Sequence, residues 1–273
     1  MERWKGTTPE VVDPDWLEKH LDDPGLRIID TRSSFDYGKG HVRNAANVEL
    51  FDIVRSQGGL PAMCIPQDKF ERLMSSRGVG NDTTVVAYDN FGGLFSARLL
   101  WTLEHFGHRR IRVFDGSIKT FLDSGGSFTS DIPEIRATRY RANHNEDNIA
   151  TKEHILSRLK DDGVRFLDVR RGGEYSGRVA FGKRGGHIPG AVHIHWLEAI
   201  DPRTARFKPF DELRSMYQSH GLTPDKEIIT YCWMGLRASH GYMMLRLLGY
   251  PKVRTYDSSF SEWGDAEGCA VEK

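Results

Sequence analysis

The chain repeats itself, and this repeat constrains its fold more than any other feature. The segment Arg27–Arg32 resembles Arg165–Arg170, which lies 138 positions later. Three further pairs of similar segments follow in the same order: Gly40–Ala45 and Gly186–Ala191, Val85–Asp89 and Ile228–Cys232, Phe114–Ser117 and Tyr256–Ser259. Collinear matches at a nearly constant separation predict two tandem copies of one domain, each of roughly 100 residues or more.

The repeat also predicts where the domains begin and end. The separation between matching segments rises from 138 to 146, so the second copy carries about eight extra residues around Ser176–Gly185. Residues 126–148 are polar and lack apolar periodicity, as linkers do. We therefore predict an N-terminal domain over 1–125, a linker over 126–148 and a C-terminal domain over 149–273.

Within each copy, short β-branched runs alternate with helical stretches. The runs around Ile28 and Val85 and the run Ile228–Tyr231 indicate strands, and Lys69–Ser76, Ser96–Phe106 and Ala238–Leu248 indicate helices. This alternation predicts an α/β fold in which each copy is a mostly parallel sheet with helices on both faces. Ligands of such sheets bind beyond the carboxyl ends of the strands.

Composition excludes several classes of partner. Lysine plus arginine equals aspartate plus glutamate, 38 against 38, so nothing favours nucleic acid or an anionic membrane. The segment Met1–His20 has no apolar core of a secretory signal, and no stretch approaches transmembrane length. Three cysteines are too few for a disulfide scaffold. We therefore expect a cytoplasmic protein in which Cys64 and Cys269 are free thiols.

One cysteine occupies a position suited to chemistry. Cys232 directly follows the predicted strand Ile228–Tyr231 and opens a short loop, Cys232–Arg237, before the predicted helix. At such a junction backbone N–H groups converge and the helix dipole adds partial positive charge. This environment favours thiolates, the nucleophilic form of cysteine. The sequence therefore nominates Cys232 as a reactive sulfur that faces an anionic substrate or intermediate.

Taken together, these segments resemble the rhodanese superfamily in its two-domain sulfurtransferase form. The matching pieces are Leu167–Arg170, Gly186–Ala191, Tyr231–Arg237 and Tyr256–Trp263. The resemblance covers nearly the whole chain and implies two tandem rhodanese-like domains. It also implies sulfur transfer through a persulfide on Cys232, with ping-pong kinetics and no cofactor. The implied donors are thiosulfate or 3-mercaptopyruvate, and the implied acceptors are cyanide, thiols or a thioredoxin-like protein.

The resemblance assigns roles to individual residues. Cys232 is the candidate nucleophile, and Arg237 would brace the loop by bonding its carbonyls or add positive charge near the sulfur. The candidate substrate-binding residues are Arg178, Arg184, Trp233, Met234, Gly235 and Leu236. In this family, arginines in the region of the first two hold the donor's sulfonate or carboxylate, and which of the two binds stays open. Glycine adopts left-handed dihedrals freely, so Gly235 would let the loop turn inward.

The N-terminal copy departs from the pattern of the C-terminal copy. Asp89 stands where Cys232 stands, and the loop that follows it is one residue longer before the helix. A carboxylate cannot carry sulfane sulfur. We therefore expect the N-terminal copy to be catalytically silent.

Loop length separates this chain from related cysteine-dependent enzymes. Phosphatases with a similar mechanism place five residues between cysteine and arginine, whereas four separate Cys232 from Arg237 here. The shorter ring suits one persulfide sulfur better than three phosphate oxygens. Phosphatase and arsenate reductase activities remain alternatives, although no resolving cysteine lies close in sequence.

Within sulfur transfer, the loop favours one donor over another. Trp233 is bulky and position 234 is Met rather than Ser, which favours thiosulfate over 3-mercaptopyruvate as the donor. A 3-mercaptopyruvate sulfurtransferase is the alternative hypothesis. A non-enzymatic persulfide carrier or interaction module is the alternative from another class.

Several histidines have structural interpretations. His187 has a counterpart, His41, in the other copy, which favours a role in a turn. His193 and His195 lack a nearby third ligand, so no metal site is assigned. His240 is interpreted as a surface residue.

The strand-end aspartates also have a structural interpretation. Asp30 and Asp168 end their predicted strands, two residues before Arg32 and Arg170. We expect each aspartate to pair with its neighbouring arginine or with backbone amides.

Overall fold

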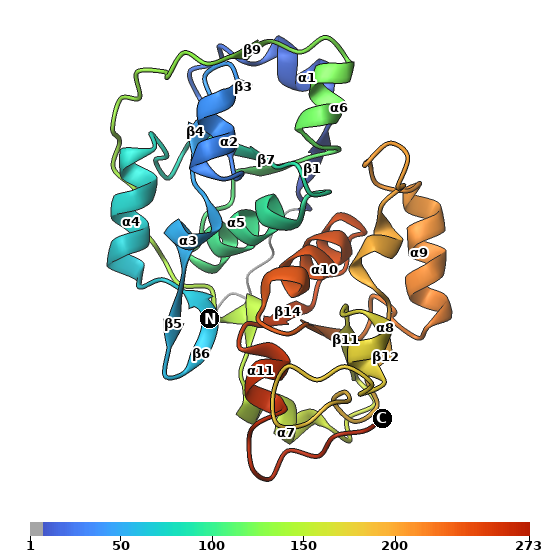
Figure 1. The fold of residues 1–273 in the computed structure, drawn as a ribbon. Helices are drawn as coiled ribbons and strands as arrows, with labels where there is room; N and C mark the ends of the chain where they lie inside the picture. The colour runs from blue at the N-terminus through green and yellow to red at the C-terminus, as the bar shows by residue number, and fades with distance from the viewer. Residues whose placement is uncertain (1–7) are drawn as a thin grey trace.

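The computed structural model, which describes residues 8–273, contains two α/β halves that follow one another along the chain (Figure 1). The elements of the N-terminal half are β1 (Glu10–Val12), α1 (Pro14–Lys19), β2 (Leu26–Asp30), α2 (Ser34–Lys39), β3 (His41–Val42), β4 (Ala46–Asn47), α3 (Leu50–Ile53), β5 (Val54–Gln57), β6 (Leu60–Cys64), α4 (Gln67–Ser76), β7 (Thr84–Tyr88), α5 (Leu94–His105), β8 (Ile111–Phe114), α6 (Ile118–Asp123) and β9 (Phe128–Thr129). Residues 1–7 of the predicted N-terminal domain lie outside the described residues.

The C-terminal half repeats this order with small variations. Its elements are the 3-10 helix η1 (Glu146–Asn148), β10 (Ile149–Ala150), α7 (Lys152–Arg158), β11 (Val164–Asp168), α8 (Gly172–Tyr175), β12 (Val192–His193), the 3-10 helix η2 (Trp196–Ala199), α9 (Phe210–Ser219), β13 (Glu227–Tyr231), α10 (Leu236–Leu247), β14 (Val253–Tyr256) and α11 (Ser259–Trp263). The predicted strands and helices are therefore present, with ends shifted by one or two residues.

Each half is built on a parallel sheet with five strands. The strand order is β1-β8-β7-β2-β4 in the first half and β10-β14-β13-β11-β12 in the second. The central pair is equivalent in the two halves, since Leu26 to Asp30 pair with Thr84 to Tyr88, and Val164 to Asp168 pair with Glu227 to Tyr231. The two orders correspond strand for strand, which confirms the predicted pair of tandem copies of one α/β domain.

Both faces of each sheet are buried, because alternate residues of the central strands pack into different cores. In β7, Val85 contributes to one hydrophobic cluster, whereas the next residue, Val86, packs against helices α1 and α6 on the opposite face. In β13, Ile228 and Ile229 divide between two clusters in the same way. Since side chains alternate along a strand, this pattern requires a covering layer on each face.

The inner cores of the two halves form one continuous cluster. Helix α5 packs against helix α10 between the sheets (Figure 1), and buried residues such as Leu99 and Leu103 of α5 belong to the same cluster as Met243 and Met244 of α10. The two copies are therefore joined by a shared apolar interior rather than by a flexible connection alone.

The predicted linker is mostly irregular but closely associated with the first half. Its residues Phe128–Thr129 form β9, which pairs with β3, and Tyr140 is buried against Phe70. The proposed boundaries at residues 125 and 149 remain predictions. Across residues 8–273, no helix combines the length and apolar character required to cross a membrane.

Candidate functional site

The loop that follows β13 is held in a tight turn around Cys232. We call residues 232–237 the Cys232 loop. Cys232 is 1% exposed, and its backbone N–H and that of Gly235 both donate to the Oγ of Ser259, at 3.0 and 3.1 Å. Gly235 has a φ of +81°, the left-handed conformation that glycine adopts at low cost. Ser259 is thus a support for the loop that sequence reasoning missed, although its segment was one of the matching pieces.

The Cys232 loop presents further backbone donors at the start of α10. Within the part of the chain that the structure describes, the amides of Trp233, Met234, Leu236 and Arg237 donate to no protein acceptor. They lie at the N-terminus of a helix of 12 residues, where the helix dipole favours negative charge. This group of amides, which we call the amide cradle, can stabilise an anion formed on or near the Cys232 sulfur.

The equivalent loop of the N-terminal half shows what such a cradle holds. The carboxylate of Asp89 accepts backbone N–H groups from Phe91, Gly93, Phe95 and Ser96 at 2.8 to 3.0 Å. Gly93, with a φ of +83°, occupies the place of Gly235. An anion therefore lies in the first copy's amide cradle, and it is fixed there by a covalent bond to the chain.

These hydrogen bonds predict a large stability effect at Asp89. Asp89→Ala should lower the free energy of unfolding by about 3 kcal/mol, because it removes a fully buried carboxylate and leaves its four backbone N–H donors without that acceptor. Asp89→Asn, which keeps one acceptor oxygen, should lose less. Urea unfolding of both variants measures the difference. Equal losses for Ala and Asn would contradict this assignment of the carboxylate.

Cys232 lies in a cavity of about 330 Å³ whose walls come from both halves of the chain. The lining residues are Phe91, Leu94, Arg171, Glu174, Phe181, His195, Trp196, Leu197, Cys232, Trp233, Met234, Leu236 and Arg237. Of the predicted site residues, the structure thus brings Cys232, Trp233, Met234, Leu236 and Arg237 together. Gly235, Arg178 and Arg184 do not line this cavity. The resemblance implied a cleft between the two domains, and Phe91 and Leu94 of the N-terminal copy, which were not among the predicted site residues, line it here.

The cavity walls are largely aromatic. Phe91 stacks on Trp196 with ring centroids 6.1 Å apart, and Phe181 meets Trp233 edge-on at 5.6 Å. Phe91 is 55% exposed and Phe181 is 65% exposed, so these rings form the rim of the cavity. Apolar rings around a reactive sulfur keep water away from it and strengthen electrostatic interactions inside the site.

Arg237 pairs with a carboxylate rather than with loop carbonyls. Its guanidinium makes a bidentate ion pair with Glu174, at 2.7 and 2.9 Å. Burial raises the pKa of Glu174, but the hydrogen bonds and charge of Arg237 outweigh it and hold that pKa below the usual value. Both groups are therefore charged at neutral pH, and the pair fixes the start of α10 to α8 beside the cavity.

The two arginines of the insertion occupy different surroundings. Arg178 is exposed and donates to the Oγ of Ser176 at 3.1 Å. Arg184 donates to the backbone carbonyls of Trp263, Gly264, Ala266 and Cys269. In this conformation Arg184 anchors the C-terminal segment, because its donors are directed at that backbone. Arg171, which the sequence did not suggest, is the arginine that lines the cavity together with Arg237.

The histidines also differ from one another in their surroundings. His195 lines the cavity, and its burial together with the charge of Arg237 lowers its pKa. His193 bonds the carbonyl of Arg170 at 2.7 Å. Among residues 8–273, no group of three or more potential His, Cys, Asp or Glu ligands is arranged to hold a metal ion. The interpretation of His240 as a surface residue is wrong: it is 2% exposed and lies between the two halves near Gly93.

The structural interpretations of the aspartates and cysteines are confirmed. Arg32 pairs with Asp30 and Arg170 pairs with Asp168, at 2.5 and 2.6 Å, in buried ion pairs. Cys64 and Cys269 are free thiols.

The turn histidines of the two copies have matching contacts. His187 stacks on Tyr175, and its counterpart His41 stacks on Tyr37. Each ring also bonds the carbonyl of the tyrosine on which it stacks. This equivalence supports a structural role for His187, because the same contacts occur in the copy that lacks a cysteine.

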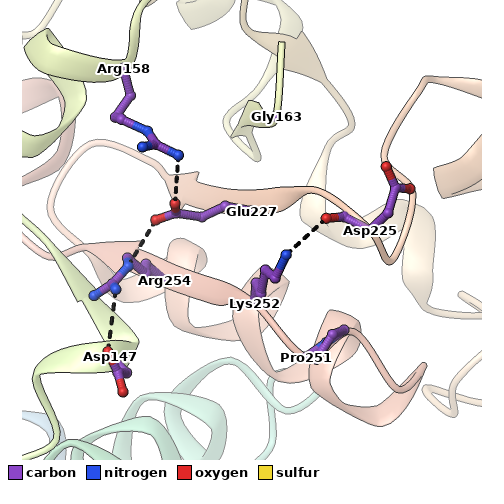
Figure 2. A pocket seen from close by; sticks show the side chains of 8 residues that line it. All are labelled: Asp147, Arg158, Gly163, Asp225, Glu227, Pro251, Lys252 and Arg254. Atoms are coloured by element: carbon purple, nitrogen blue, oxygen red, sulfur yellow. Dashed lines mark hydrogen bonds and ion pairs between the residues drawn. The ribbon is translucent and has the colours of Figure 1, made fainter. Parts of the chain in front are cut away.

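A second cavity, of about 370 Å³, lies at the opposite edge of the C-terminal sheet, where β13 and β14 begin (Figure 2). Four of its charged side chains form ion pairs: Arg158 and Arg254 both reach Glu227, and Arg254 also reaches Asp147. Its lining contains no cysteine. The first cavity, which contains Cys232, is therefore the candidate active site.

Comparison with known proteins agrees with the geometry. The model of the rhodanese-like domain matches residues 13–124 and 151–266. The chain is 33% identical to the sulfur carrier protein TtuD of Thermus thermophilus, with 97% of each chain covered. It is 30% identical to a thiosulfate sulfurtransferase of Azotobacter vinelandii, again with 97% of each covered. Among solved structures, it resembles SseA of Escherichia coli, a 3-mercaptopyruvate sulfotransferase, with a TM-score of 0.84 and 26% identity over 93% of this chain and 100% of that one.

Proposed function

The chain belongs to the family of rhodanese-domain sulfurtransferases, and on this basis we propose that it moves sulfane sulfur from thiosulfate to a thiophilic acceptor through a persulfide on Cys232. The observation that carries this proposal is the pair of equivalent loops. One loop holds the carboxylate of Asp89 with four amides, and the other places a cysteine beside four amides that have no protein acceptor among the described residues.

The first half-reaction loads the enzyme. The Cys232 thiolate attacks the outer sulfur of thiosulfate, the sulfur–sulfur bond of the donor breaks, and sulfite leaves with the electron pair of that bond. The product is a persulfide whose terminal sulfur carries the negative charge. The amide cradle supports this step, because its donors lie where the charge develops.

The second half-reaction unloads the enzyme. The carbon of cyanide attacks the terminal persulfide sulfur, the bond between the two sulfurs breaks, and thiocyanate leaves. The Cys232 thiolate is restored, so no external oxidant or reductant is needed. A thiol acceptor takes the same sulfur and becomes a persulfide. Asp89 cannot undergo either step, and we assign the N-terminal copy a supporting role.

Two cations supply the attraction for an anionic donor. Arg171 and Arg237 both line the cavity, and a guanidinium binds the oxygens of a sulfonate or a carboxylate in a bidentate manner. The charge of Arg237 is largely balanced by Glu174. We therefore propose that Arg171 contributes most to the attraction of the donor. Arg178 is a further exposed cation, within the insertion around Ser176–Gly185.

Two other functions are supported by specific relatives. The likeness to SseA favours 3-mercaptopyruvate as the donor. The likeness to TtuD, which is named a sulfur carrier protein, favours a role in which the Cys232 persulfide is passed to a protein. The exposed aromatic rim formed by Phe91 and Phe181 is compatible with a large acceptor.

Donor preference is tested directly with the purified protein. Thiocyanate formation from cyanide should be faster with thiosulfate than with 3-mercaptopyruvate at equal concentration. The reverse order would keep the mechanism and change the substrate. A persulfide that forms on Cys232 but yields negligible thiocyanate would favour the carrier, and no persulfide with either donor would contradict sulfur transfer altogether.

A further inference from the structure

A buried cation of the N-terminal copy lies directly beneath the Cys232 loop. Arg98, in the middle of α5, is fully buried. Its guanidinium pairs with Asp257 of the C-terminal half at 2.5 Å and reaches the Oγ of Ser239 in α10 at 3.5 Å. A Cβ built on Gly235 would lie 2.9 Å from the same guanidinium and 2.5 Å from Asp257. The pair therefore packs against the backbone of the loop itself.

Asp257 connects this cation to the rest of the loop. It lies between β14 and Ser259, whose Oγ accepts the N–H groups of Cys232 and Gly235. Its second carboxylate oxygen accepts the backbone N–H of Cys64, again from the N-terminal half, at 3.2 Å. Two groups of the first copy thus fix the segment that supports the second copy's reactive cysteine.

The repeat provides an internal comparison. In the numbering of the repeat, His240 occupies the place of Arg98 and Asp115 occupies the place of Asp257. Asp115 accepts the backbone N–H of Phe207 across the interface at 2.8 Å, as Asp257 accepts that of Cys64. His240 lies beneath Gly93, and burial lowers its pKa to about 4, so it is neutral at physiological pH.

The two copies differ in the side chain on which the loop after the central strand packs. The loop that contains Asp89 packs on a neutral imidazole, whereas the loop that contains Cys232 packs on a guanidinium with an ion-pair partner. The architecture of the repeat does not itself require the cation, because the first copy is built without one at this place. Burial lowers the pKa of Arg98, but the charge of Asp257 outweighs that effect and raises it above its ordinary value.

We propose that Arg98 is a positioning residue for Cys232: through Asp257 it holds the Cys232 loop in the conformation that directs the amide cradle at the sulfur. The expected change in kcat rests on the proposed sulfur transfer. The expected change in the conformation of the loop does not depend on it. Two ion pairs adjoin the Cys232 loop, Arg98 with Asp257 and Arg237 with Glu174. The N-terminal copy would then act on the reaction from outside the cavity as well as from its wall.

The test compares two buried ion pairs that both join helix α5 to the C-terminal half. The double variant Arg98→Gln with Asp257→Asn removes both charges and leaves no unpaired buried ion. The matched control is Arg246→Gln with Glu104→Gln, which removes the α10–α5 pair whose residues are 6% and 3% exposed and whose atoms are 3.7 Å apart. Arg98→Lys keeps the charge and serves as the conservative variant.

Two measurements separate positioning from stability. Hydrogen exchange of a peptide that spans the Cys232 loop should accelerate by about tenfold in the Arg98/Asp257 variant and stay within about twofold of wild type in the control. The kcat for thiocyanate formation should fall by about tenfold in the first variant, with little change in the KM for thiosulfate, and Arg98→Lys should recover part of the loss.

The outcomes are distinguishable. Equal acceleration of loop exchange in both double variants would overturn the proposal and make Arg98 a stability element. If wild type shows no turnover with any donor, the proposed function fails, yet the exchange comparison still decides whether Arg98 positions the loop. If the Arg98/Asp257 variant does not fold, loop exchange in Arg98→Lys decides: exchange of the loop peptide faster than in wild type, at unchanged global stability, supports positioning by the guanidinium, and unchanged exchange overturns the proposal.

Discussion

Cys232→Ser should reduce thiocyanate formation by roughly a thousandfold or more, because a serine oxygen cannot accept and release sulfane sulfur. Serine is close in size to cysteine, so the free energy of unfolding should change little at this buried position. The measurement is thiocyanate release from thiosulfate and cyanide, together with the mass of the protein after exposure to thiosulfate. Wild type should gain the mass of one sulfur atom, and the variant should gain none.

The control for this substitution is Cys269→Ser. Cys269 is a free thiol near the end of the chain and lies outside the lining of the Cys232 cavity. This variant should retain turnover and persulfide formation. Retention of sulfur by Cys232→Ser, or its loss in Cys269→Ser, would place the reactive thiol elsewhere and contradict the assigned mechanism.

Gly235→Ala should be the most disruptive single-methyl change in the Cys232 loop. At a φ of +81° an alanine costs about 1–2 kcal/mol from backbone strain alone. The added Cβ would also lie 2.5 and 2.7 Å from two oxygens of Asp257, closer than real contacts allow. We expect a total loss of about 3 kcal/mol in the free energy of unfolding, and a fall in kcat because the amide cradle is displaced.

Gly249→Ala isolates the backbone contribution. Gly249 has a φ of +85°, follows α10, and has nothing within 4 Å of its added Cβ. Its variant should lose only about 1–2 kcal/mol of stability and keep normal turnover. Urea unfolding and thiocyanate assays of the two variants give the comparison. Similar losses at both glycines would show that the loop yields to the methyl group, so that packing against Asp257 does not define its shape.

The sequence predicted most of the architecture, because the information lies in local patterns that recur. The buried run Ile228–Tyr231 and the helix after Gly235 were recognisable from apolar runs and a glycine at a turn. The matching segments of the two copies predicted that both copies share one fold. Pairing of Asp168 with Arg170 was also predictable, since the two residues are close in sequence.

The contacts that were missed join residues distant in sequence. Glu174 meets Arg237 across 63 positions, and Arg98 meets Asp257 across 159. Neither pair leaves a local pattern in the sequence. His240 was misplaced for a related reason: polar residues near it in α10 suggest exposure, but Ser239, His240 and Arg246 are all buried.

The insertion shows the same limit. Arg184 carries a charge suited to an anionic donor, but its guanidinium is directed at four carbonyls of the C-terminal segment. A charge near a site in sequence does not determine which way the side chain points. The resemblance implied a cleft between the domains, but that Phe91 and Leu94 are the residues of the first copy that line it is known only from the packing of the two halves.

The face at which α5 meets α10 has the geometry of a two-fold interface that exists within one polypeptide. Glu104 and Arg246 occupy equivalent places in the two copies and face each other. In a homodimer with true two-fold symmetry, equivalent positions carry the same residue, so two glutamates or two arginines would meet there and repel. Joining the copies in one chain removes that restriction, and each half can specialise to complement the other. The two halves of the single chain therefore complement each other as the two different subunits of a heterodimer do, and they are always made in equal amounts.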